Sequence, residues 1–490
     1  MLMQNELVTG IPRRAPRPPA SNRGAKPGQP PKQMAVRLAG PTRRVARREG
    51  GDLKSAATWS VRVLFYGITA VIAGLWLKDG GVTGVHDIIT LLISAGRFTG
   101  LFAAYVLLLQ VLLMARLPFL QWTVGFDTLM KRHRLSGKVS LALILAHVAT
   151  ITAGYALQSK ISILAQTEQF LTSWPGMVPA LLGTLLLIAV AVSSFVIVRR
   201  KLRYQSWYAV HLMAYLGIFL AWFHQIPAGN EFVNNPLAAA FWTALYVVTL
   251  QLVLLFRVLQ PALGFLWHRM RVTEVTREGP GVVSLHISGH HLDWLNARPG
   301  QWFSWRFLDR DRWHEAHPYS LSAAPDGKSF RITIKDLGDF SRALAGVKPG
   351  TFALAEGPFG AFTAEARTRD RVALIAGGVG ITPIRALLED LRGDVVLIYR
   401  AEQAGDLLFR DELDALARER GITIHYLLGD HRAPGSAHLL SREHLRGLIP
   451  DIAHRDVYLC GPAGMIRAVH RVLHRLGVPK TLIHIDEFAF

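Results

Sequence analysis

Cysteine is almost absent from this chain of 490 residues, in which Cys460 is the only one. A single cysteine excludes a disulfide-built scaffold. It also excludes an iron–sulfur cluster or a cysteine-rich zinc site, because both need several such ligands. Charge is scarce as well: 18% of residues are charged, against about 25% in ordinary soluble domains. Acidic residues are the scarcer sign, with 35 against 55 basic residues.

Apolar residues are abundant, at 50% of the chain. This content excludes disorder throughout, because there is enough apolar surface to bury. The length predicts roughly three domains.

The first 54 residues differ from the rest. They contain twelve basic and three acidic residues, a net charge of +9, and are rich in proline and glycine. Because no apolar period is present, we expect residues 1–57 to form a disordered basic tail. It lacks the apolar core of a signal peptide. An arginine-rich arm could contact nucleic acid, but the apolar stretches that follow favour a cytoplasmic tail beside anionic lipid.

Six apolar stretches follow, each long enough to cross a bilayer with about 20 residues. They lie near residues 59–77, 96–117, 136–157, 176–198, 207–227 and 237–257. Basic residues gather in the loops at 116–138 and 199–203 and after the last stretch. The positive-inside rule therefore predicts a multi-pass protein of a cell membrane, by our expectation a bacterial inner membrane, with both termini in the cytoplasm.

Histidines recur at matched spacing in two of these stretches. His133 and His147 are 14 residues apart in the third, and His211 and His224 are 13 apart in the fifth. At 1.5 Å per residue these separations are about 21 and 19.5 Å, and each pair shares one helix face. Two such helices side by side would pair His133 with His211 and His147 with His224. Neutral imidazoles are common axial ligands of haem, so the pairs predict two stacked haems.

Other uses of membrane histidines stay open. A lone histidine in a span is more often a packing or helix-bonding residue, and a proton relay would also use such groups. The matched double spacing favours porphyrins over both.

Two motifs around these histidines resemble the ferric reductase-like transmembrane domain of ferric reductases and NADPH oxidases. They are Arg132-His133-Arg134-Leu135-Ser136-Gly137 and Tyr204-Gln205-Ser206-Trp207-Tyr208-Ala209-Val210-His211. The resemblance implies six spans and two b-type haems, with histidine ligands on the third and fifth spans.

From about residue 263 the sequence is typical of soluble domains. Alternating strand patterns at 282–287, 302–305 and 330–334 predict a small antiparallel barrel. Buried strand patterns at 372–375, 395–399 and 456–459, with a helix from Pro383, predict a parallel α/β domain. The fold class is therefore multi-domain: a six-span all-α membrane bundle, an antiparallel β-barrel and an α/β nucleotide-binding domain.

The barrel contains two motifs suited to a flavin nucleotide. An aromatic and a hydroxyl can hold the ring and ribityl chain, and a glycine before a helix lets backbone N–H groups meet a pyrophosphate. Together they resemble the FAD domain of the ferredoxin reductase type, although His317 stands where that family usually has arginine. The residues implied as FAD contacts are His317, Pro318, Tyr319, Ser320, Lys335, Gly338 and Ser341.

A glycine-rich turn follows the first strand of the α/β domain and opens a helix, as a dinucleotide turn requires. A generic turn is the alternative. The pattern resembles the NAD(P) turn of ferredoxin reductases, and Tyr458-Leu459-Cys460-Gly461-Pro462 resembles their second nicotinamide motif. The implied nucleotide contacts are Gly377, Gly378, Gly380, Thr382, Pro383, Gly461 and Pro462.

Four further residues acquire candidate roles, three of them from this resemblance and Arg400 from its position in the sequence. Cys460 would lie beside the hydride-transfer centre, although a buried small hydrophobe is the alternative. Phe490 would cover the flavin until nicotinamide displaces it, with Phe488 as second choice. Arg400 follows the second nucleotide strand, where a base can meet a 2′-phosphate, and favours NADPH over NADH.

The module order implies a transmembrane NAD(P)H oxidoreductase. Electrons would pass from cytoplasmic NADPH through FAD and two b-type haems to an extracytoplasmic acceptor, either a ferric chelate or oxygen. Arg97 could attract an anionic acceptor, or be an ordinary interfacial arginine. Ile151 stands where oxidases place a further histidine, which weakens a dedicated oxygen-reducing role.

The alternative is a membrane-anchored, haem-free flavin reductase that serves a cytoplasmic acceptor. We expect the lipid bilayer and a small-molecule or ion acceptor as partners, and no nucleic acid; the oligomeric state stays open. The expected domains are 1–57 (tail), 58–262 (membrane domain), 263–368 (FAD barrel) and 369–490 (NAD(P)-binding domain).

Overall fold

The structure is a computed structural model that describes residues 43–195, 198, 204–430, 433–436 and 438–488. Most of the expected basic tail, residues 1–42, lies outside the described residues. The first helix, α1 (Arg43–Lys78), begins before the expected end of that tail, so residues 43–57 are helical rather than disordered. Arginine, alanine and glutamate are good helix formers, which favours extending the span's helix in this direction.

Six helices within the described residues are long and apolar enough to cross a membrane. This confirms the six predicted spans, although several are longer than expected. The candidate spans are Ser55–Lys78, Ile88–Met114, Thr128–Ser159, Met177–Ser194, Gln205–Ala228 and Pro236–His268. They lie in α1, α2 (Ile88–Met114), α4 (Phe126–Ser159), α6 (Met177–Ser194), α8 (Tyr204–Ala228) and α10 (Pro236–Leu254) with its continuation.

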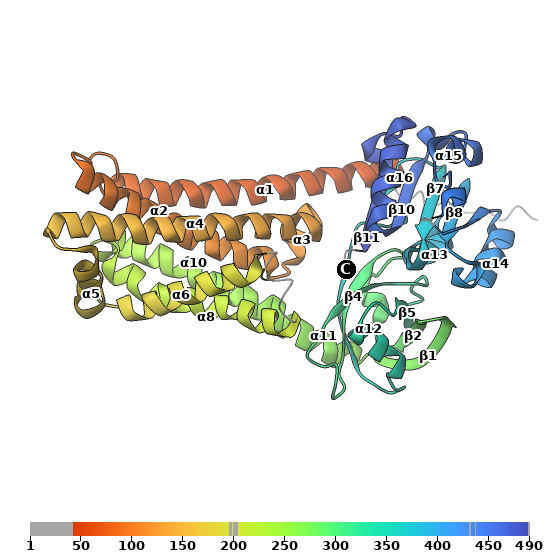
Figure 1. Ribbon diagram of the computed structural model, residues 1–490, viewed down its shortest axis with the longest axis horizontal. Coiled ribbons are helices and arrows are strands. Elements are labelled where there is room, and N and C mark those ends of the chain that lie inside the picture. The colour runs from red at the N-terminus through yellow and green to blue at the C-terminus, as the bar shows by residue number, and fades with distance from the viewer. Residues whose placement is uncertain (1–42, 196–197, 199–203, 431–432, 437, 489–490) are drawn as a thin grey trace, which may run out of the picture. The chain divides into compact units, whose positions relative to one another are not determined.

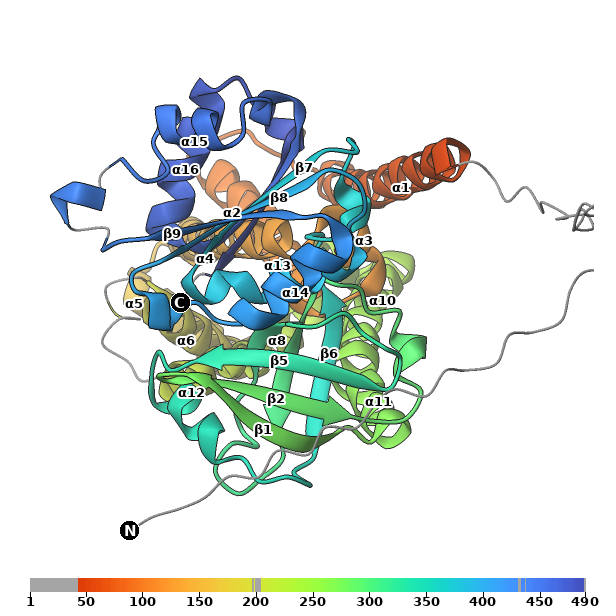
Figure 2. The same cartoon turned by 90° about the vertical axis from the view of Figure 1, so that its right-hand side faces the viewer.

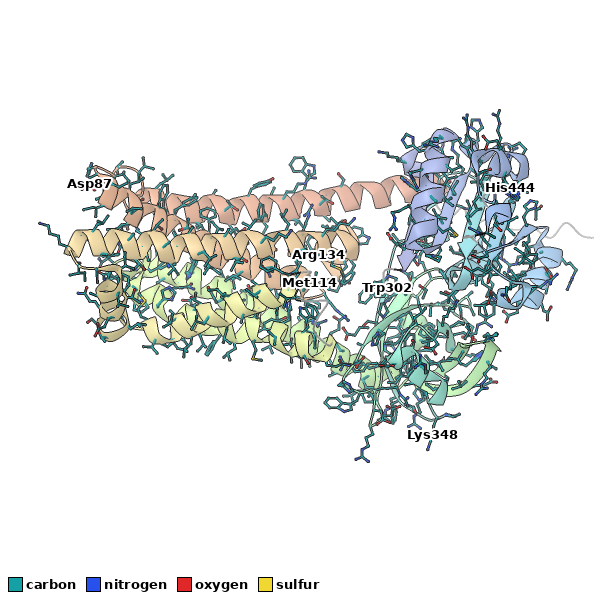
Figure 3. The ribbon with its side chains drawn as sticks, viewed as in Figure 1. Asp87, Met114, Arg134, Trp302, Lys348 and His444 are labelled. Carbon is teal, nitrogen blue, oxygen red and sulfur yellow. The ribbon has the colours of Figure 1, made fainter. Side chains whose placement is uncertain are left out.

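Short helices complete the membrane domain. They are α3 (Pro118–Val124), α5 (Ile163–Ser173), α9 (Asn230–Val233), a π-helical stretch (Leu255–Leu259) and α11 (Gln260–His268). Asp87, which caps α2, lies at one end of the bundle, whereas Met114 and Arg134 lie near the other (Figure 3). The basic loop residues and the acidic cap therefore mark opposite ends of the helices.

Small residues let the long helices approach closely. A methyl group added to Gly96 of α2 would lie 3.0 Å from Ile151 of α4. One added to Gly183 of α6 would lie 2.6 Å from the carbonyl oxygen of Gly217 on α8. Close backbone approach is how helices pack in lipid, where no hydrophobic force drives them together. The histidine-bearing helices α4 and α8 are held by α2 and α6 in this way.

The barrel consists of two three-stranded antiparallel sheets joined by single bridges. One sheet has the order β1–β2–β5 and the other β4–β3–β6; Figure 2 shows several of these strands. The predicted strands all form, and the core is aromatic, with Phe303, Trp305 and Phe330 buried together. The strands are β1 (Arg271–Gly279), β2 (Val282–Ser288), β3 (Trp302–Phe307), β4 (His317–Ser320), β5 (Ser329–Lys335) and β6 (Ala353–Phe359).

The last domain is a parallel five-stranded sheet of order β11–β10–β7–β8–β9. Helices α13 and α14 cover one face and α15 and α16 the other. Strand order reverses between β7 and β10, and open α/β sheets bind ligands at such a switch point, beyond the carboxyl ends of the strands. The elements are β7 (Val372–Gly377), α13 (Ile381–Asp390), β8 (Val395–Ala401), α14 (Arg410–Arg420), β9 (Thr423–Leu428), α15 (Arg442–Leu448), β10 (Asp456–Pro462), α16 (Ala463–Arg475) and β11 (Ile483–Phe488).

Candidate functional site

The four span histidines meet in two pairs between α4 and α8. The ring centroids of His133 and His211 lie 6.0 Å apart, and those of His147 and His224 lie 6.4 Å apart. These are the pairs that the spacing predicts. A metal–imidazole nitrogen bond is about 2 Å long, and the ring centre lies about 1 Å further, so two axial imidazoles place their centroids about 6 Å apart. Both centroid separations therefore match the distance that a bis-histidine haem requires.

Backbone carbonyls of α2 orient two of these rings. Nδ1 of His133 lies 3.1 Å from the carbonyl oxygen of Gln110, and Nδ1 of His147 lies 2.7 Å from that of Gly96. Because a carbonyl oxygen only accepts, each Nδ1 must hold the proton. The Nε2 lone pair is then left for a metal, as second-shell carbonyls commonly arrange.

The α8 histidines have more modest polar neighbours. Nδ1 of His211 lies 3.3 Å from the Ser194 hydroxyl, whereas Nδ1 of His224 is buried without a hydrogen-bond partner among the described residues. The ring of Trp207 also packs against His211, with centroids 5.1 Å apart.

A cavity of about 260 Å³ adjoins the His147–His224 pair. Its walls come from α2, α4, α5, α6, α8, α9 and α10 and are mainly apolar, with Tyr155, Phe170 and Trp174 packed edge to face against one another. An apolar cavity with two converging imidazoles is suited to a porphyrin rather than to a hydrated ion. No cluster of three or more histidine, cysteine or acidic ligands occurs in the part of the chain that the structure describes.

Arg97 lines the same cavity and is held by two carboxylates. Its Nε donates to Glu231 at 2.8 Å, and its Nη2 forms an ion pair with Asp79. The Glu231 side chain is only 3% exposed and that of Arg97 only 14%. One positive and two negative charges leave this cluster with a net charge of −1. The positive charge of Arg97 is therefore compensated by carboxylates, and its side chain is buried rather than extended toward the membrane surface.

The two flavin motifs of the barrel lie against each other. The ring of His317, at the start of β4, stacks on Phe340 in α12 (Asp339–Ala343), with centroids 3.9 Å apart. The hydroxyl of Ser341 accepts from the Leu337 N–H at 2.8 Å and donates to the Gly338 carbonyl. A methyl group added to Gly338 would meet no described atom within 4 Å. This open backbone beside a stacked aromatic pair fits a flavin nucleotide.

The remaining predicted flavin contacts lie on β4 and at the end of β5. Tyr319 is half-buried, Ser320 is buried, and Pro318 and Lys335 are exposed. Burial, with the nearby Glu315 carboxylate, raises the pKa of Tyr319, so its hydroxyl stays protonated.

Glu315 connects the flavin motif to a histidine-bearing helix, a role that no motif in the sequence indicates. One oxygen lies 2.9 Å from Nε2 of His317, and the other accepts from the side-chain amide of Gln205 in α8. Partial burial alone would raise the pKa of Glu315, but these two hydrogen bonds outweigh it and lower the pKa. The only feature of the sequence that could have indicated this role is that Glu315 lies two positions before His317.

Glu356 on β6 makes a second contact between the barrel and the membrane domain. It forms ion pairs with Arg116, which follows α2, and with Arg257 in the π-helical stretch. Beside them, Phe126 of α4 contacts the rings of Trp302 and Phe359 at 5.7 and 6.0 Å. Together with the Glu315–Gln205 contact, the barrel is thus attached to four different membrane segments.

The glycine turn and the second nicotinamide motif meet at the switch point between β7 and β10. A methyl group on Gly380 would lie 2.5 Å from the Cys460 carbonyl, and one on Gly377 would lie 2.4 Å from the Met465 sulfur. Gly378 has φ +54° and open space around it. Only glycine permits this close packing together with an exposed turn.

Other predicted nucleotide contacts fall around this turn. Thr382 and Pro383 are buried in the first turn of α13, and the Thr382 hydroxyl donates to the Val379 carbonyl at 3.0 Å. The Arg400 guanidinium, at the end of β8, donates to the Gly429 carbonyl at 3.4 Å.

Cys460 is completely buried within β10, between β7 and β11. Burial and the neighbouring Asp486 raise the pKa of its thiol well above the ordinary value, so it stays protonated. Phe488 pairs in register with Pro462 at the carboxyl end of the sheet. Phe490 lies outside the described residues.

Two parts of the chain match models of known protein families. The family described as the ferric reductase like transmembrane component matches residues 99–222, and the oxidoreductase NAD-binding domain matches residues 374–471. The chain therefore joins a ferric reductase transmembrane component to an FAD/NAD-binding module of the ferredoxin reductase type. It is a multi-pass membrane protein.

Curated relatives resemble part of the chain. A flavohemoprotein of Pseudomonas putida is 37% identical over 230 residues, which is 45% of this chain and 58% of the relative. An NADPH oxidoreductase of Mycobacterium tuberculosis is 29% identical over 234 residues, 45% of this chain and 60% of the relative. The chain thus spans about three fifths of the length of these relatives.

A solved structure shows a weaker likeness. The flavohem-like FAD/NAD binding domain of nitric oxide dioxygenase from Vibrio cholerae is 27% identical, with a TM-score of 0.37. The match covers 45% of this chain and 98% of that one.

Proposed function

We propose that this protein is a transmembrane NAD(P)H oxidoreductase that holds FAD in its barrel and two b-type haems between α4 and α8. The observation that supports it best is the meeting of His133 with His211 and of His147 with His224, at the separation that two axial ligands need. When bound, the flavin converts a two-electron donor into single-electron transfers, and haems relay single electrons.

The chain's own residues contribute placement. Gln110 and Gly96 hold His133 and His147 in the tautomer whose Nε2 can bind iron. His317, Phe340 and Gly338 would hold the flavin nucleotide, and Gly378 and Gly380 would let the backbone approach the pyrophosphate of NAD(P)H. Arg400 stands where it can contact a 2′-phosphate, which supports NADPH as the donor.

Cys460 and the terminal aromatic residues have proposed positions near the nicotinamide. Cys460 lies at the switch point, where it would shape the ring's pocket as a neutral thiol. Phe490 would shield the flavin face. The register of Phe488 with Pro462 supports this proposal, because it brings the chain just before Phe490 to the carboxyl end of the sheet.

Orientation and acceptor belong to the proposal as well. The basic loops support a cytoplasmic reductase module. The acceptor would be a ferric chelate or oxygen on the far side, next to the Arg97 cluster. The competing function is a haem-free flavin reductase with a cytoplasmic acceptor.

Haem content decides between these two functions. Full-length protein is produced with a haem precursor, and its haem is counted from a reduced pyridine adduct. Two haems per chain are expected, and about one in His133→Ala or His211→Ala, with FAD content unchanged. His86→Ala, a histidine outside both pairs, is the matched control. Haem-free wild-type protein that still oxidises NADPH would establish the competing function.

A further inference from the structure

The sixth candidate span is too long for the bilayer it crosses. It covers the 33 residues Pro236–His268, or about 50 Å of helix, whereas the hydrocarbon core is about 30 Å thick. Arg257 already pairs with Glu356 of the barrel. The last turns, including α11, therefore lie at or beyond the edge of the hydrocarbon.

Helix α11 nevertheless presents apolar side chains away from the protein. Its Phe265 packs against Phe352 beside β6, with ring centroids 5.5 Å apart. On its other side Leu263, Leu266 and Trp267 are 54%, 60% and 53% exposed. This apolar face has no covering element among the described residues.

The loop between β2 and β3 extends the same face onto the barrel. Within a short 3₁₀ turn (Leu292–Leu295), Leu292 is buried and Trp294 is 62% exposed. The Trp294 ring lies 5.6 Å from that of Trp267, and His291 contacts both rings at 5.3 and 5.7 Å. We call Leu263, Leu266, Trp267, His291 and Trp294 the interfacial patch.

Hydrogen bonds fix the two parts of this patch to each other. The His268 imidazole donates through Nδ1 to the His290 carbonyl at 3.0 Å, and the His290 N–H donates to the His268 carbonyl at 2.7 Å. A methyl group on Gly289 would lie 2.7 Å from that same His268 carbonyl, so the loop sits directly on the end of α11. The two exposed tryptophans are thus held in a fixed position next to each other.

We propose that the interfacial patch inserts into the headgroup region of the leaflet nearest the barrel and docks the barrel on the bilayer. The exposed apolar surface is continuous with the lipid-facing side of the span, where Val258 and Leu259 are 58% and 49% exposed. Tryptophan is enriched at this depth because its ring is apolar and its N–H is polar. The exposed Arg269 and Arg271 supply positive charge for lipid phosphates.

A second copy of the chain is the competing occupant. Lipid is favoured because the patch adjoins a membrane span and has basic residues beside it, as a headgroup layer requires. The proposal depends only on the membrane spans, so it can fail while the redox function stands, and the reverse also holds.

The single buried cysteine makes a direct test possible. In full-length protein, Trp294→Cys places a nitroxide label on the patch, and Leu266→Cys provides a second position if the first variant folds poorly. Arg277→Cys is the matched control, because it is exposed on β1 six residues beyond Arg271, about 20 Å away. The proteins are reconstituted in vesicles containing anionic lipid, and label relaxation by oxygen and by a water-soluble nickel chelate is measured.

Lipid docking predicts that the label at position 294 gains oxygen contact and loses nickel contact relative to the label at 277. Equal nickel contact at both positions would overturn the proposal. Shielding at 294 from both reagents, with spin–spin broadening that disappears on dilution with unlabelled protein, would also overturn it and identify a second copy as the occupant.

Discussion

A methyl group on Gly100 of α2 would lie 2.6 Å from Nδ1 of His147. Real side chains do not tolerate this distance, so Gly100 is the residue that allows the His147 ring to stand between α2 and α8. The relationship links this glycine to the geometry of the proposed haem site at His147 and His224.

Gly100→Ala should therefore remove about one of two haems per chain by displacing His147. Intrinsic helix propensity works the other way, since alanine favours a helix over glycine by about 1 kcal/mol. Gly74→Ala in α1 is the control, because a methyl group there meets nothing within 4 Å. Haem content measured as above checks this, and equal haem in all three proteins would contradict the proposed role of Gly100.

Glu356→Gln should loosen the barrel from the membrane domain, because it removes the negative charge between Arg116 and Arg257. We expect the free energy that holds the barrel against the membrane domain to fall by about 1–3 kcal/mol. This is less than the roughly 3–5 kcal/mol lost when a fully buried ion pair is broken. NADPH should still bleach the flavin at the normal rate, while haem reduction slows in stopped-flow absorbance. Glu365→Gln is the control, since Glu365 pairs with Arg298 at a solvent-exposed site. An unchanged haem rate in Glu356→Gln would exclude this docking role.

Glu231→Gln should change the choice of acceptor. It brings the Arg97 cluster from a net charge of −1 to neutral, so anionic ferric chelates should gain kcat/KM. At about 10 Å in water the gain is roughly twofold per unit charge of the chelate, and salt should reduce it. Glu168→Gln makes the same charge change at an exposed site on α5. The same gain in both variants would mean that only the general surface field matters.

The buried thiol of Cys460 should make the stability of the folded protein depend on pH. Burial raises the pKa of its thiol in the folded protein, so folding favours the protonated form. This stabilisation is complete below the unfolded pKa of about 8.5 and is lost as the pH rises toward the higher folded value. Between pH 7 and pH 10, the midpoint temperature of thermal unfolding should thus fall less steeply for Cys460→Ala than for the natural protein. Parallel curves would show that the thiol does not titrate this way.

Local patterns were sufficient to predict much of this molecule. The six spans followed from apolar length, and the meeting of His133 with His211 followed from helical periodicity, because both signals are repeated along one helix. The strands at 282–287 and 372–375 were equally clear, since alternation and buried runs are local properties.

Contacts between distant segments could not be predicted in this way. His147 is oriented by the Gly96 carbonyl, and the charge of Arg97 is compensated by the carboxylates of Asp79 and Glu231. These partners lie far away in the sequence and have no local signature. The helical start at Arg43 was missed because proline and glycine upstream dominated the composition. The roles of the flavin and nicotinamide contacts stay predictions.

Anaerobic stopped-flow absorbance after NADPH is added to the purified, haem-supplied protein tests the proposed function most directly. We predict that the flavin band bleaches first and that the bands of reduced b-type haem then appear, with the second phase absent in His211→Ala. Flavin bleaching without any haem signal in the natural protein would contradict a transmembrane electron path and leave a membrane-anchored flavin reductase.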